Sequence, residues 1–584
     1  MISSRRTSTL LRLFARYLAP RRGWVVLMIF IMICNAGAQL ALPSLIASFI
    51  DGAAARLPAG VMGGIALTFL VVALVSQVTA ALGKYLATDL GMRATNALRS
   101  DVLSHVLAQD IGWHNATTPG ALIERIDGDA SRLNTFLSNM LPNLLVNSLL
   151  LAGTLGALFW IDWRAGALGV AYLPTAWLVV RVIRPHSTRL FNHEREQSAR
   201  LFGFIEEHLA GTEDVRANGA VDHVMRRFFT ASRPWAAAMA RAQIVGSLSW
   251  LSPAMLYSFV LAAMLALGVW LIGAGAITLG SLVALYRYTF LLSQPLNDIG
   301  RQVMELFEAS ASAARLDELL AQTPALSENG TRTLPSGALA LNVEHVSFAY
   351  ADAQNNVLRD ISLGLTPRRV LGLLGRTGSG KTTLTRLIAR LYDVSAGEIR
   401  MNGQNIAGVA AANLRQRVTV VTQEVQVFSA SARDNITLFD KDIDDARIWS
   451  ALDRVGLRGW AEALPRGLET ELAAGGSGLS AGQAQLLAFA RAFLRDPGLV
   501  ILDEASSRLD PATELQLERA IDALLQGRTA IVIAHRLKTV QRASDILVLE
   551  DGAIAEYGER AALAADPSSR YYALLNFGAE EVLA

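Results

Sequence analysis

The chain has 584 residues, a length that predicts two or more domains. It is 52% hydrophobic and only 18% charged, with a mean hydropathy of +0.33, which disfavours an ordinary soluble protein. The net charge of +2 gives no broad field for a polyanion, so no nucleic-acid partner is expected. The single cysteine, Cys34, excludes intrachain disulfides and cysteine metal clusters.

The chain begins with an arginine-rich segment, residues 1–22, that contains no acidic residue. An uncharged apolar run, 24–50, follows it. A signal peptide is the alternative, since residues 36–38 (Ala-Gly-Ala) resemble a cleavage site. However, the run is too long for a signal peptide and long enough to span a membrane. We therefore expect the basic N-terminus to stay in the cytoplasm.

Five more apolar runs of spanning length follow, at about 60–83, 138–160, 165–183, 246–272 and 278–300. The two long links between spans, 84–137 and 184–245, are polar, arginine-rich and helical in periodicity. The positive-inside rule places both termini and both long links in the cytoplasm. These patterns predict a multi-pass protein of the plasma (inner) membrane.

Arg287 is the notable charge within these spans, because it lies well inside the sixth. A charge at this depth is expected to face the interior of the helix bundle or a watery cavity. Arg287 therefore either lines a cavity, where it touches or repels the cargo, or is a structural arginine bonded to carbonyls or a neighbouring helix.

The composition changes after the spans. Helical periodicity over 305–322 is followed by a stretch rich in Pro, Ser, Gly and Thr. We expect a cytoplasmic segment at 1–22, a transmembrane domain at 23–310, a linker at 311–339 and a soluble domain at 340–584, which starts with a strand at 341–346.

A glycine-rich loop in the soluble domain fits the phosphate-binding pattern G-x-x-x-x-G-K-[ST]. An apolar strand, 369–374, precedes it, and helical periodicity over 383–391 follows it. Lys381 is expected to reach the β- and γ-phosphates, and Thr382 to offer its hydroxyl to Mg2+. The residues expected to bind the nucleotide here are Gly375, Arg376, Thr377, Gly378, Ser379, Gly380, Lys381, Thr382 and Thr383.

A second apolar run, 499–502, ends in Asp503 and Glu504. Both carboxylates are therefore expected at the carboxyl end of a strand, where open α/β sheets bind ligands. Asp503 is suited to holding Mg2+ through water, and Glu504 to polarising the attacking water.

With these motifs, the chain from about residue 15 to 570 resembles exporter-type ABC transporters, in which six spans and one nucleotide-binding domain share a chain. The resemblance rests on motifs in the family's order. They are the aromatic loop ending at Tyr350, the phosphate loop, the glutamine loop ending at Gln423, the signature Leu-Ser-Ala-Gly-Gln at 479–483, the Asp503–Glu504 pair, the D-loop ending at Asp510, and the switch histidine His535.

The resemblance implies a multidomain fold, an all-α six-helix transmembrane domain followed by a P-loop α/β ABC ATPase domain. It implies that Tyr350 stacks on adenine, Gln423 binds Mg2+, and His535 contacts the γ-phosphate. It also implies that a second half-transporter completes the site, because the signature faces ATP on the opposite domain. The signature residues are Ser480, Ala481, Gly482 and Gln483. Short coupling helices are expected near 113–122 and 211–218.

The signature departs from the family pattern. Ala481 replaces the usual glycine, Ala484 replaces a frequent arginine, and 472–478 lacks the acidic residue that many exporters carry there. Because Glu504 and His535 are retained, we favour a heterodimer over a homodimer, with this chain supplying the catalytic acid.

The predicted function is ATP-driven export of an amphipathic drug, lipid, peptide or siderophore by alternating access. The resemblance disfavours an importer, and six spans exclude a soluble ABC ATPase. The remaining alternative is a membrane sensor or assembly component whose ATPase signals without transporting.

Overall fold

A computed structural model of the chain describes residues 2–576, apart from 327–328, 351–354, 477, 504–510 and 534–539. The chain divides into two compact units. The first comprises Met1–Leu107 and Pro119–Gln322, and the second comprises Ala108–Thr118 and Thr323–Ala584.

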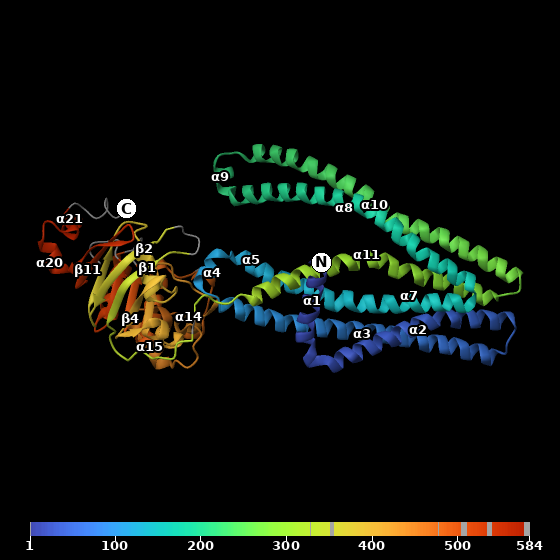
Figure 1. The fold of residues 1–584 in the computed structure, drawn as a ribbon, viewed down its shortest axis with the longest axis horizontal. Helices are drawn as coiled ribbons and strands as arrows, with labels where there is room; N and C mark the ends of the chain where they lie inside the picture. Colours follow the sequence, from blue (N-terminus) through green and yellow to red (C-terminus); the bar gives the residue numbers. More distant parts are fainter. Residues whose placement is uncertain are drawn as a thin grey trace. The chain divides into compact units, whose positions relative to one another are not determined.

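The first unit is entirely helical in the part described (Figure 1). Its long helices are α2 (Arg22–Ala54), α3 (Ala59–Leu107), α7 (Leu141–Ile161), α8 (Trp163–Ala210), α10 (Val221–Gly273) and α11 (Leu279–Ala321). Shorter elements are α1 (Ile2–Leu18), η1 (Ala19–Arg21), α5 (Pro119–Ile123), α6 (Ala130–Thr135), α9 (Thr212–Ala217) and the two π-helical stretches η2 (Glu124–Asp129) and η3 (Phe136–Met140).

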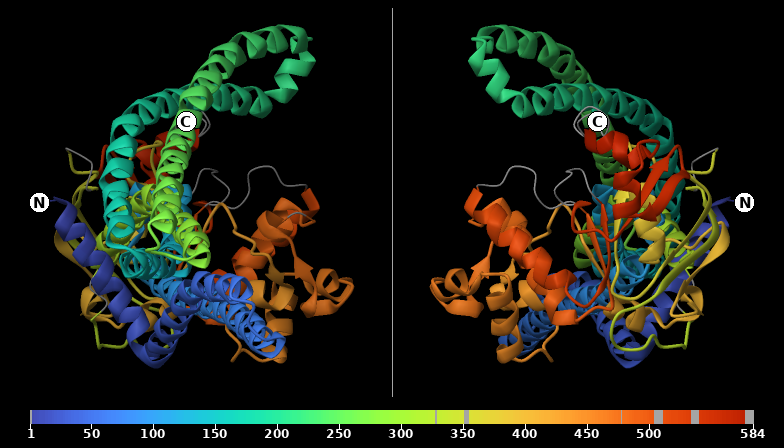
Figure 2. Two further views of the ribbon diagram at one scale, coloured as in Figure 1. Left: turned by 90° about the vertical axis from the view of Figure 1, so that its right-hand side faces the viewer. Right: turned by 90° about the vertical axis from the view of Figure 1, so that its left-hand side faces the viewer.

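Four stretches among these described helices are long and apolar enough to cross a membrane, namely Arg12–Ala54, Ala59–Leu107, Pro119–Ile161 and Val221–Gly273. The other two predicted spans, 165–183 and 278–300, lie within α8 and α11. Helix α10 has 53 residues, so at 1.5 Å per residue it is ~80 Å long and far exceeds a bilayer core. The helices α8 and α10 pack against each other and are joined by α9 at the end of this hairpin (Figures 1 and 2).

Helix α1 at the N-terminus was not predicted from the sequence. Leu10, Leu13 and Phe14 are buried on one side of it. The ring of Phe14 stacks on Phe136 with centroids 5.3 Å apart, and Tyr17 donates a 2.8 Å hydrogen bond to Asp101. The segment expected only as a basic flank is therefore packed onto the helical unit.

Asp51 connects the ends of two helices. Its carboxylate accepts a 2.6 Å hydrogen bond from the Thr278 hydroxyl and a 2.8 Å bond from the Gly280 N–H. Thr278 in turn caps α11 by accepting from the N–H of Ser281 at 3.1 Å. Gly280 leaves room for this approach, because a Cβ there would lie 2.2 Å from the Ala47 carbonyl. The end of α2 is thus fastened to the start of α11.

The second unit is built around two larger sheets. A six-stranded sheet has the order β12-β11-β3-β10-β9-β6, in which β12 alone is antiparallel to its neighbour, and a four-stranded antiparallel sheet has the order β2-β1-β4-β5. The strands are β1 (Leu341–Phe348), β2 (Leu358–Leu365), β3 (Val370–Leu374), β4 (Ala396–Met401), β5 (Gln404–Asn405), β6 (Val418–Val421), β9 (Leu499–Asp503), β10 (Thr529–Ile533), β11 (Asp545–Glu550) and β12 (Ala553–Glu559), and a small pair is formed by β7 (Ala430–Ser431) and β8 (Glu471–Leu472).

Helices surround these sheets. They are α4 (Ile111–Ala116), α12 (Lys381–Ile388), α13 (Ala411–Arg417), α14 (Ala432–Thr437), α15 (Asp445–Arg454), α16 (Arg458–Glu462), α17 (Ala481–Arg495), α18 (Pro511–Leu525), α20 (Arg560–Ala565) and α21 (Arg570–Asn576), with short η turns at Ile406–Gly408, Gly467–Glu469 and Ala474–Gly476. One apolar core joins the four-stranded sheet, α12 and one set of side chains of the six-stranded sheet. A separate core joins the other set to the helices α14 to α18.

Several boundaries differ from the sequence predictions. The strand predicted at 341–346 continues to Phe348, and the helix predicted at 383–391 begins earlier, at Lys381, and ends earlier, at Ile388. The helix stops there because Arg390 has a left-handed φ of 51°. Helix α11 continues without a break from the sixth predicted span to Ala321, so residues 311–321 are helical.

Candidate functional site

The sheet order brings the predicted nucleotide motifs to neighbouring strand ends. β3, β10, β9 and β6 are parallel and consecutive in the sheet. The phosphate loop follows β3, Asp503 ends β9, and Gln423 comes shortly after β6. The carboxyl ends of parallel strands lie at one edge of a sheet, so these residues lie along one edge.

Glycines give the phosphate loop its shape. Gly375, Gly378 and Gly380 have φ values of 148°, 86° and 101°, a region that residues with a side chain rarely adopt. A Cβ on Gly375 would lie 2.3 Å from the carbonyl oxygen of Leu549, and one on Gly380 would lie 2.6 Å from Leu358 Cδ2. The loop therefore curls tightly onto the N-terminus of α12, where backbone N–H groups favour a bound anion.

Two buried side chains in this loop fit a phosphate ligand. Lys381 is 6% exposed, and its ammonium donates to the carbonyls of Gly375 at 2.6 Å and Arg376 at 2.9 Å. Burial lowers the pKa of Lys381, and the charge of Asp503 partly opposes this effect. Ser379 is 4% exposed, and its hydroxyl lacks a hydrogen-bond partner among the described residues. A buried cation and an orphaned hydroxyl in a glycine cradle match the chemistry of a nucleotide phosphate.

Tyr350 lies close to this loop. Its hydroxyl is 3.1 Å from the hydroxyl of Thr383, the second threonine after Lys381. The Tyr350 ring meets Phe348 and Tyr392 edge to face, with centroids 4.9 Å and 5.3 Å away. The aromatic side chain predicted to stack on adenine is therefore held beside the phosphate loop by two other rings.

The predicted magnesium ligands offer only oxygen atoms, which Mg2+ prefers. Thr382 is exposed at the start of α12, Gln423 is exposed, and Asp503 is half-buried. Thr422 holds the turn beside Gln423 by donating a 2.8 Å hydrogen bond to the carbonyl of Glu424. Glu504, Asp510 and His535 lie outside the described residues.

The signature sequence begins α17. The hydroxyl of Ser480 accepts from the N–H of Gln483 at 3.1 Å, and the Gln483 side chain accepts from the N–H of Ser480 at 2.9 Å. This reciprocal capping box fixes the helix start. The N–H groups of Ala481 and Gly482 have no partner within the described part of the chain, and Ala481 is exposed. The signature therefore presents two backbone donors and a hydroxyl at the N-terminus of a 15-residue helix.

Short helices occur at both predicted coupling positions: α4 begins two residues before the first and overlaps its start, and α9 lies within the second. Asp110 caps α4 by accepting from the N–H of Trp113 at 2.9 Å, and it also accepts from the N–H of Ala325 at 2.9 Å. Asn115 at the other end of α4 donates a 3.0 Å hydrogen bond to the Tyr392 hydroxyl. Sequence reasoning missed Tyr392, because its partners come from distant parts of the chain.

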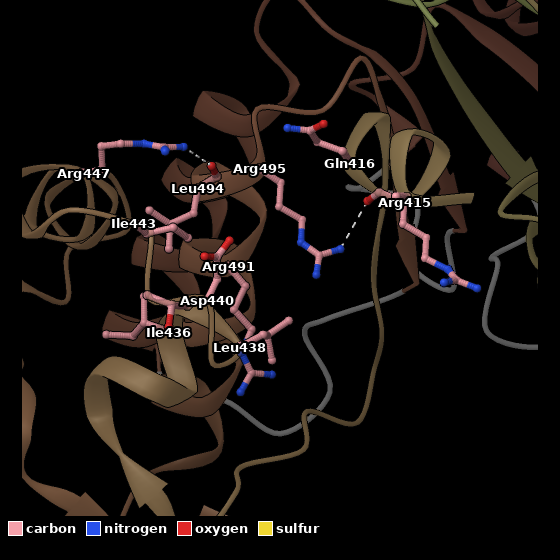
Figure 3. Close-up of a pocket in the computed structure, with 12 residues that line it drawn as sticks. Arg415, Gln416, Ile436, Leu438, Asp440, Ile443, Arg447, Arg491, Leu494 and Arg495 are labelled. Atoms are coloured by element: carbon pink, nitrogen blue, oxygen red, sulfur yellow. Dashed lines mark hydrogen bonds between the residues drawn. The ribbon is translucent and has the colours of Figure 1, made fainter. Parts of the chain in front are cut away.

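A second site that sequence reasoning missed is a pocket of about 420 Å3 (Figure 3). It is lined by four arginines and one acidic residue, namely Arg415, Arg447, Arg491, Arg495 and Asp440. Three of the arginines donate hydrogen bonds to backbone carbonyls. Arg447 donates to Leu494 at 2.7 Å, and Arg495 donates to Arg415 at 3.2 Å. Arg491 donates to both Asn435 at 2.8 Å and Gln426 at 2.9 Å. No phosphate-loop residue lines this pocket, so it is distinct from the nucleotide site.

Comparisons with known proteins match both the helical part and the ATP-binding part of the chain. Residues 25–296 match the family model described as ABC transporter transmembrane region, and residues 358–507 match the model described as ABC transporter. A solved bacterial Atm1-family ABC exporter with ATP bound shares the fold, with a TM-score of 0.77 and 24% identity, over 95% of this chain and 98% of that one.

Curated relatives match along most of the chain. A multidrug resistance ABC transporter ATP-binding and permease protein of Lactococcus lactis is 28% identical over 94% of this chain and 92% of its own length. An ATP-dependent lipid A-core flippase of Cupriavidus metallidurans is 30% identical over 95% and 94%. A fatty acid ABC transporter ATP-binding/permease protein of Mycobacterium tuberculosis is 31% identical over 80% and 74%.

The helical unit, the phosphate-loop domain and these matches confirm the predicted fold class. The chain is a multi-pass membrane protein that binds ATP, and it belongs to the ABC transporter family as an exporter-type half-transporter whose ATPase drives transport.

Proposed function

We propose that the chain is one half of a dimeric exporter in the inner membrane, with both termini in the cytoplasm, which moves an amphipathic molecule outward by alternating access. The observation that carries this proposal is the row of nucleotide motifs along one sheet edge in a chain that also supplies long membrane helices.

ATP with Mg2+ supplies the phosphoryl group whose transfer to water drives the cycle. Phosphoryl transfer depends mainly on positioning and electrostatics. Lys381 and the loop N–H groups hold the phosphates, and Tyr350 orients the base. The oxygen atoms of Thr382, Gln423 and Asp503 are the proposed Mg2+ ligands. Glu504 is proposed to accept a proton from the attacking water, and His535 to contact the terminal phosphate.

The dimer follows from the unused donors of the signature. Ser480, Ala481 and Gly482 face no phosphate of their own chain in the family arrangement, so a second chain is needed to use them. We favour a heterodimer because this chain keeps Glu504 and His535 while Ala481 puts a methyl group where glycine is usual. Purification of the chain alone is the test, and a stable homodimer with vigorous, cooperative ATPase would contradict the heterodimer.

The relatives' names include multidrug resistance, a lipid A-core flippase and a fatty acid transporter, and lipid A and fatty acids share an amphipathic character. We extend only this shared property to the present chain. An amphipathic molecule suits spans that are apolar overall yet carry isolated polar residues such as Gln39 and Arg287.

The alternative is a sensor or assembly component that hydrolyses ATP without moving cargo. Inside-out vesicles containing the chain and any copurifying partner separate the two. An exporter accumulates its substrate only with ATP, and Glu504→Gln abolishes accumulation while ATP binding persists. Hydrolysis without accumulation of any compound from a panel of drugs, lipids and peptides would refute export.

A further inference from the structure

We infer that the exported molecule is an anionic amphiphile, recognised by Arg287 on a polar and aromatic face of α11. This inference rests on the proposed export function and adds the charge of the cargo's head group. Its evidence is the pattern of exposure along α11, the absence of a counter-charge for Arg287, and the contrast with two other arginines.

The N-terminal half of helix α11 has one buried side and one exposed side. Ala284, Leu285, Tyr288 and Leu292 are at most 4% exposed and pack in the apolar core of the helical unit. Tyr286, Arg287, Phe290 and Gln294 are exposed. Arg287 and Gln294 are seven residues apart, so they share a face and lie ~10 Å apart along the helix. This face combines a cation and an amide with two aromatic rings.

Lipid does not suit this face. Arg287 is ~12 Å along the helix from Leu279, the first residue of α11, which is farther than one side chain extends. Arg287 therefore cannot reach the nearer membrane surface by extending its side chain, and a charge at this depth belongs in a watery cavity or against a partner.

No counter-charge for Arg287 is present in the described part of the chain. Arg287 makes no hydrogen bond, ion pair or cation–π contact with the described residues. The six predicted spans contain a single acidic residue, Asp298, which stands ~16 Å farther along α11. In the homodimer case the partner is a second copy of the chain, which adds no other acidic residue within the spans.

Arg181, within a predicted span, and Arg164, directly before that span, are engaged differently. Arg164 lies over the ring of Trp270 at 4.7 Å, and Arg181 lies over the ring of Trp177 at 4.8 Å. Such cation–π contacts stabilise arginines near the ends of membrane helices without a ligand. Arg287 lacks such an arrangement, which points to a bound anion as its partner.

The face also fits the apolar part of an amphiphile. The ring of Phe290 meets Tyr257 of α10 edge to face, with centroids 6.5 Å apart. Phe290 and Tyr286 are one turn apart and are 41% and 42% exposed. A carboxylate or phosphate at Arg287 therefore has aromatic surface beside it for an acyl or alkyl chain.

Four ten-carbon probes of equal chain length test the charge preference: decanoate, decyl phosphate, decanol and decyltrimethylammonium. The assembled transporter in nanodiscs is titrated with each, and the half-stimulating concentration for ATPase is measured. We expect this concentration to be about tenfold lower for the anions than for decanol, since a charge-assisted hydrogen bond is gained. The ratio of the half-stimulating concentrations of decanoate and decyl phosphate shows which anionic head group is preferred.

Arg287→Gln should bring decanoate and decanol to the same half-stimulating concentration, whereas Arg287→Lys should keep part of the difference. The control is Arg181→Gln, which should keep the full preference. Equal responses of the unaltered protein to anionic and neutral probes would overturn the inference, as would a preference that survives Arg287→Gln. If Arg287→Gln fails to assemble, as judged by size-exclusion chromatography, the probe series on the unaltered protein and on Arg287→Lys still decides the matter.

The inference and the export proposal fail in different ways. ATP-dependent accumulation of a radiolabelled neutral or cationic probe in inside-out vesicles, without accumulation of decanoate, would overturn the anionic class and leave export intact. Hydrolysis without accumulation of any probe would overturn export itself.

Discussion

Asn115 donates a 3.0 Å hydrogen bond to the hydroxyl of Tyr392, although the two residues are 277 positions apart in the chain. The ring of Tyr392 meets Tyr350 at 5.3 Å, and the hydroxyl of Tyr350 lies 3.1 Å from that of Thr383. A continuous series of contacts therefore joins α4 to the proposed adenine platform and to the helix after the phosphate loop.

The first prediction concerns this series. Tyr392→Phe keeps the ring contacts but removes the hydroxyl, and Asn115→Leu removes the donor. Each should reduce the cargo stimulation of ATPase about fivefold, since one hydrogen bond contributes about 1 kcal/mol. ATPase with and without decanoate is the measurement. The double variant should be no worse than either single one, and additive losses would show that the two residues act separately.

The second prediction is a pH dependence of nucleotide affinity. Burial lowers the pKa of Lys381 below the 10.5 of an ordinary lysine, and bound phosphates favour its charged form. Below the lowered pKa the lysine is charged in both states, so ATP affinity should be flat. As pH rises through that pKa, binding must take up a proton, and affinity should fall on the alkaline side before pH 10.5 is reached.

Binding of a fluorescent ATP analogue across alkaline pH measures this effect. Lys381→Arg provides the control, because an arginine stays charged over the whole range. The arginine variant should bind more weakly at neutral pH and show a flatter pH profile. An identical alkaline fall in both proteins would assign the effect to another group.

The third prediction concerns the methyl group at the start of α17. Ala481→Gly should let a phosphate approach the N–H groups of residues 481 and 482 more closely and raise the ATP affinity of the site that this signature completes about fivefold, as measured by binding of a fluorescent ATP analogue to the assembled transporter. Ala484→Gly is the matched control, because it introduces glycine into the same helix beyond the capping box. The control should only lower thermal stability, and a gain in ATP affinity there would argue against a specific effect at the phosphate.

The fourth prediction is a loss of stability at the connection between α2 and α11. Asp51→Ala removes the acceptor of the Thr278 hydroxyl and the Gly280 N–H and should lower the free energy of unfolding by about 1.5–3 kcal/mol. Thermal unfolding in nanodiscs measures the change. Ser48→Ala one turn earlier should have little effect, because the Ser48 hydroxyl donates only to the Ser44 carbonyl of its own helix.

Much of the nucleotide site could be predicted from sequence because its chemistry is local. The glycines, Lys381 and Thr382 lie in one short loop, and an apolar strand before it fixes the loop's place in the sheet. Asp503 was likewise predicted at a strand end, and β9 ends there. The roles of Glu504, Asp510 and His535 remain predictions, because these residues lie outside the described part of the chain.

The features that sequence reasoning missed depend on contacts between distant segments. In the sequence Tyr392 is an isolated tyrosine after α12, and only the structure shows that Asn115 and Tyr350 contact it. The pocket of Figure 3 is lined by arginines from α13, α15 and α17, and no spacing in the sequence predicts that these arginines lie together. Helix α1 was missed because the many arginines in this segment suggested a solvent-exposed flank, although Leu10, Leu13 and Phe14 form a buried apolar face.

Two of the apolar cores of the ATP-binding unit support different parts of the nucleotide site, which has an evolutionary consequence. The phosphate loop lies between β3 and α12, whose buried side chains belong mainly to the core shared by the two sheets, whereas the signature helix α17 packs in the core of the helical layer. After gene duplication, one copy can therefore lose the quality of its signature while its own nucleotide grip stays intact. Such a copy would then need a partner with an intact signature to complete its own ATP site, which favours asymmetry between paired half-transporters.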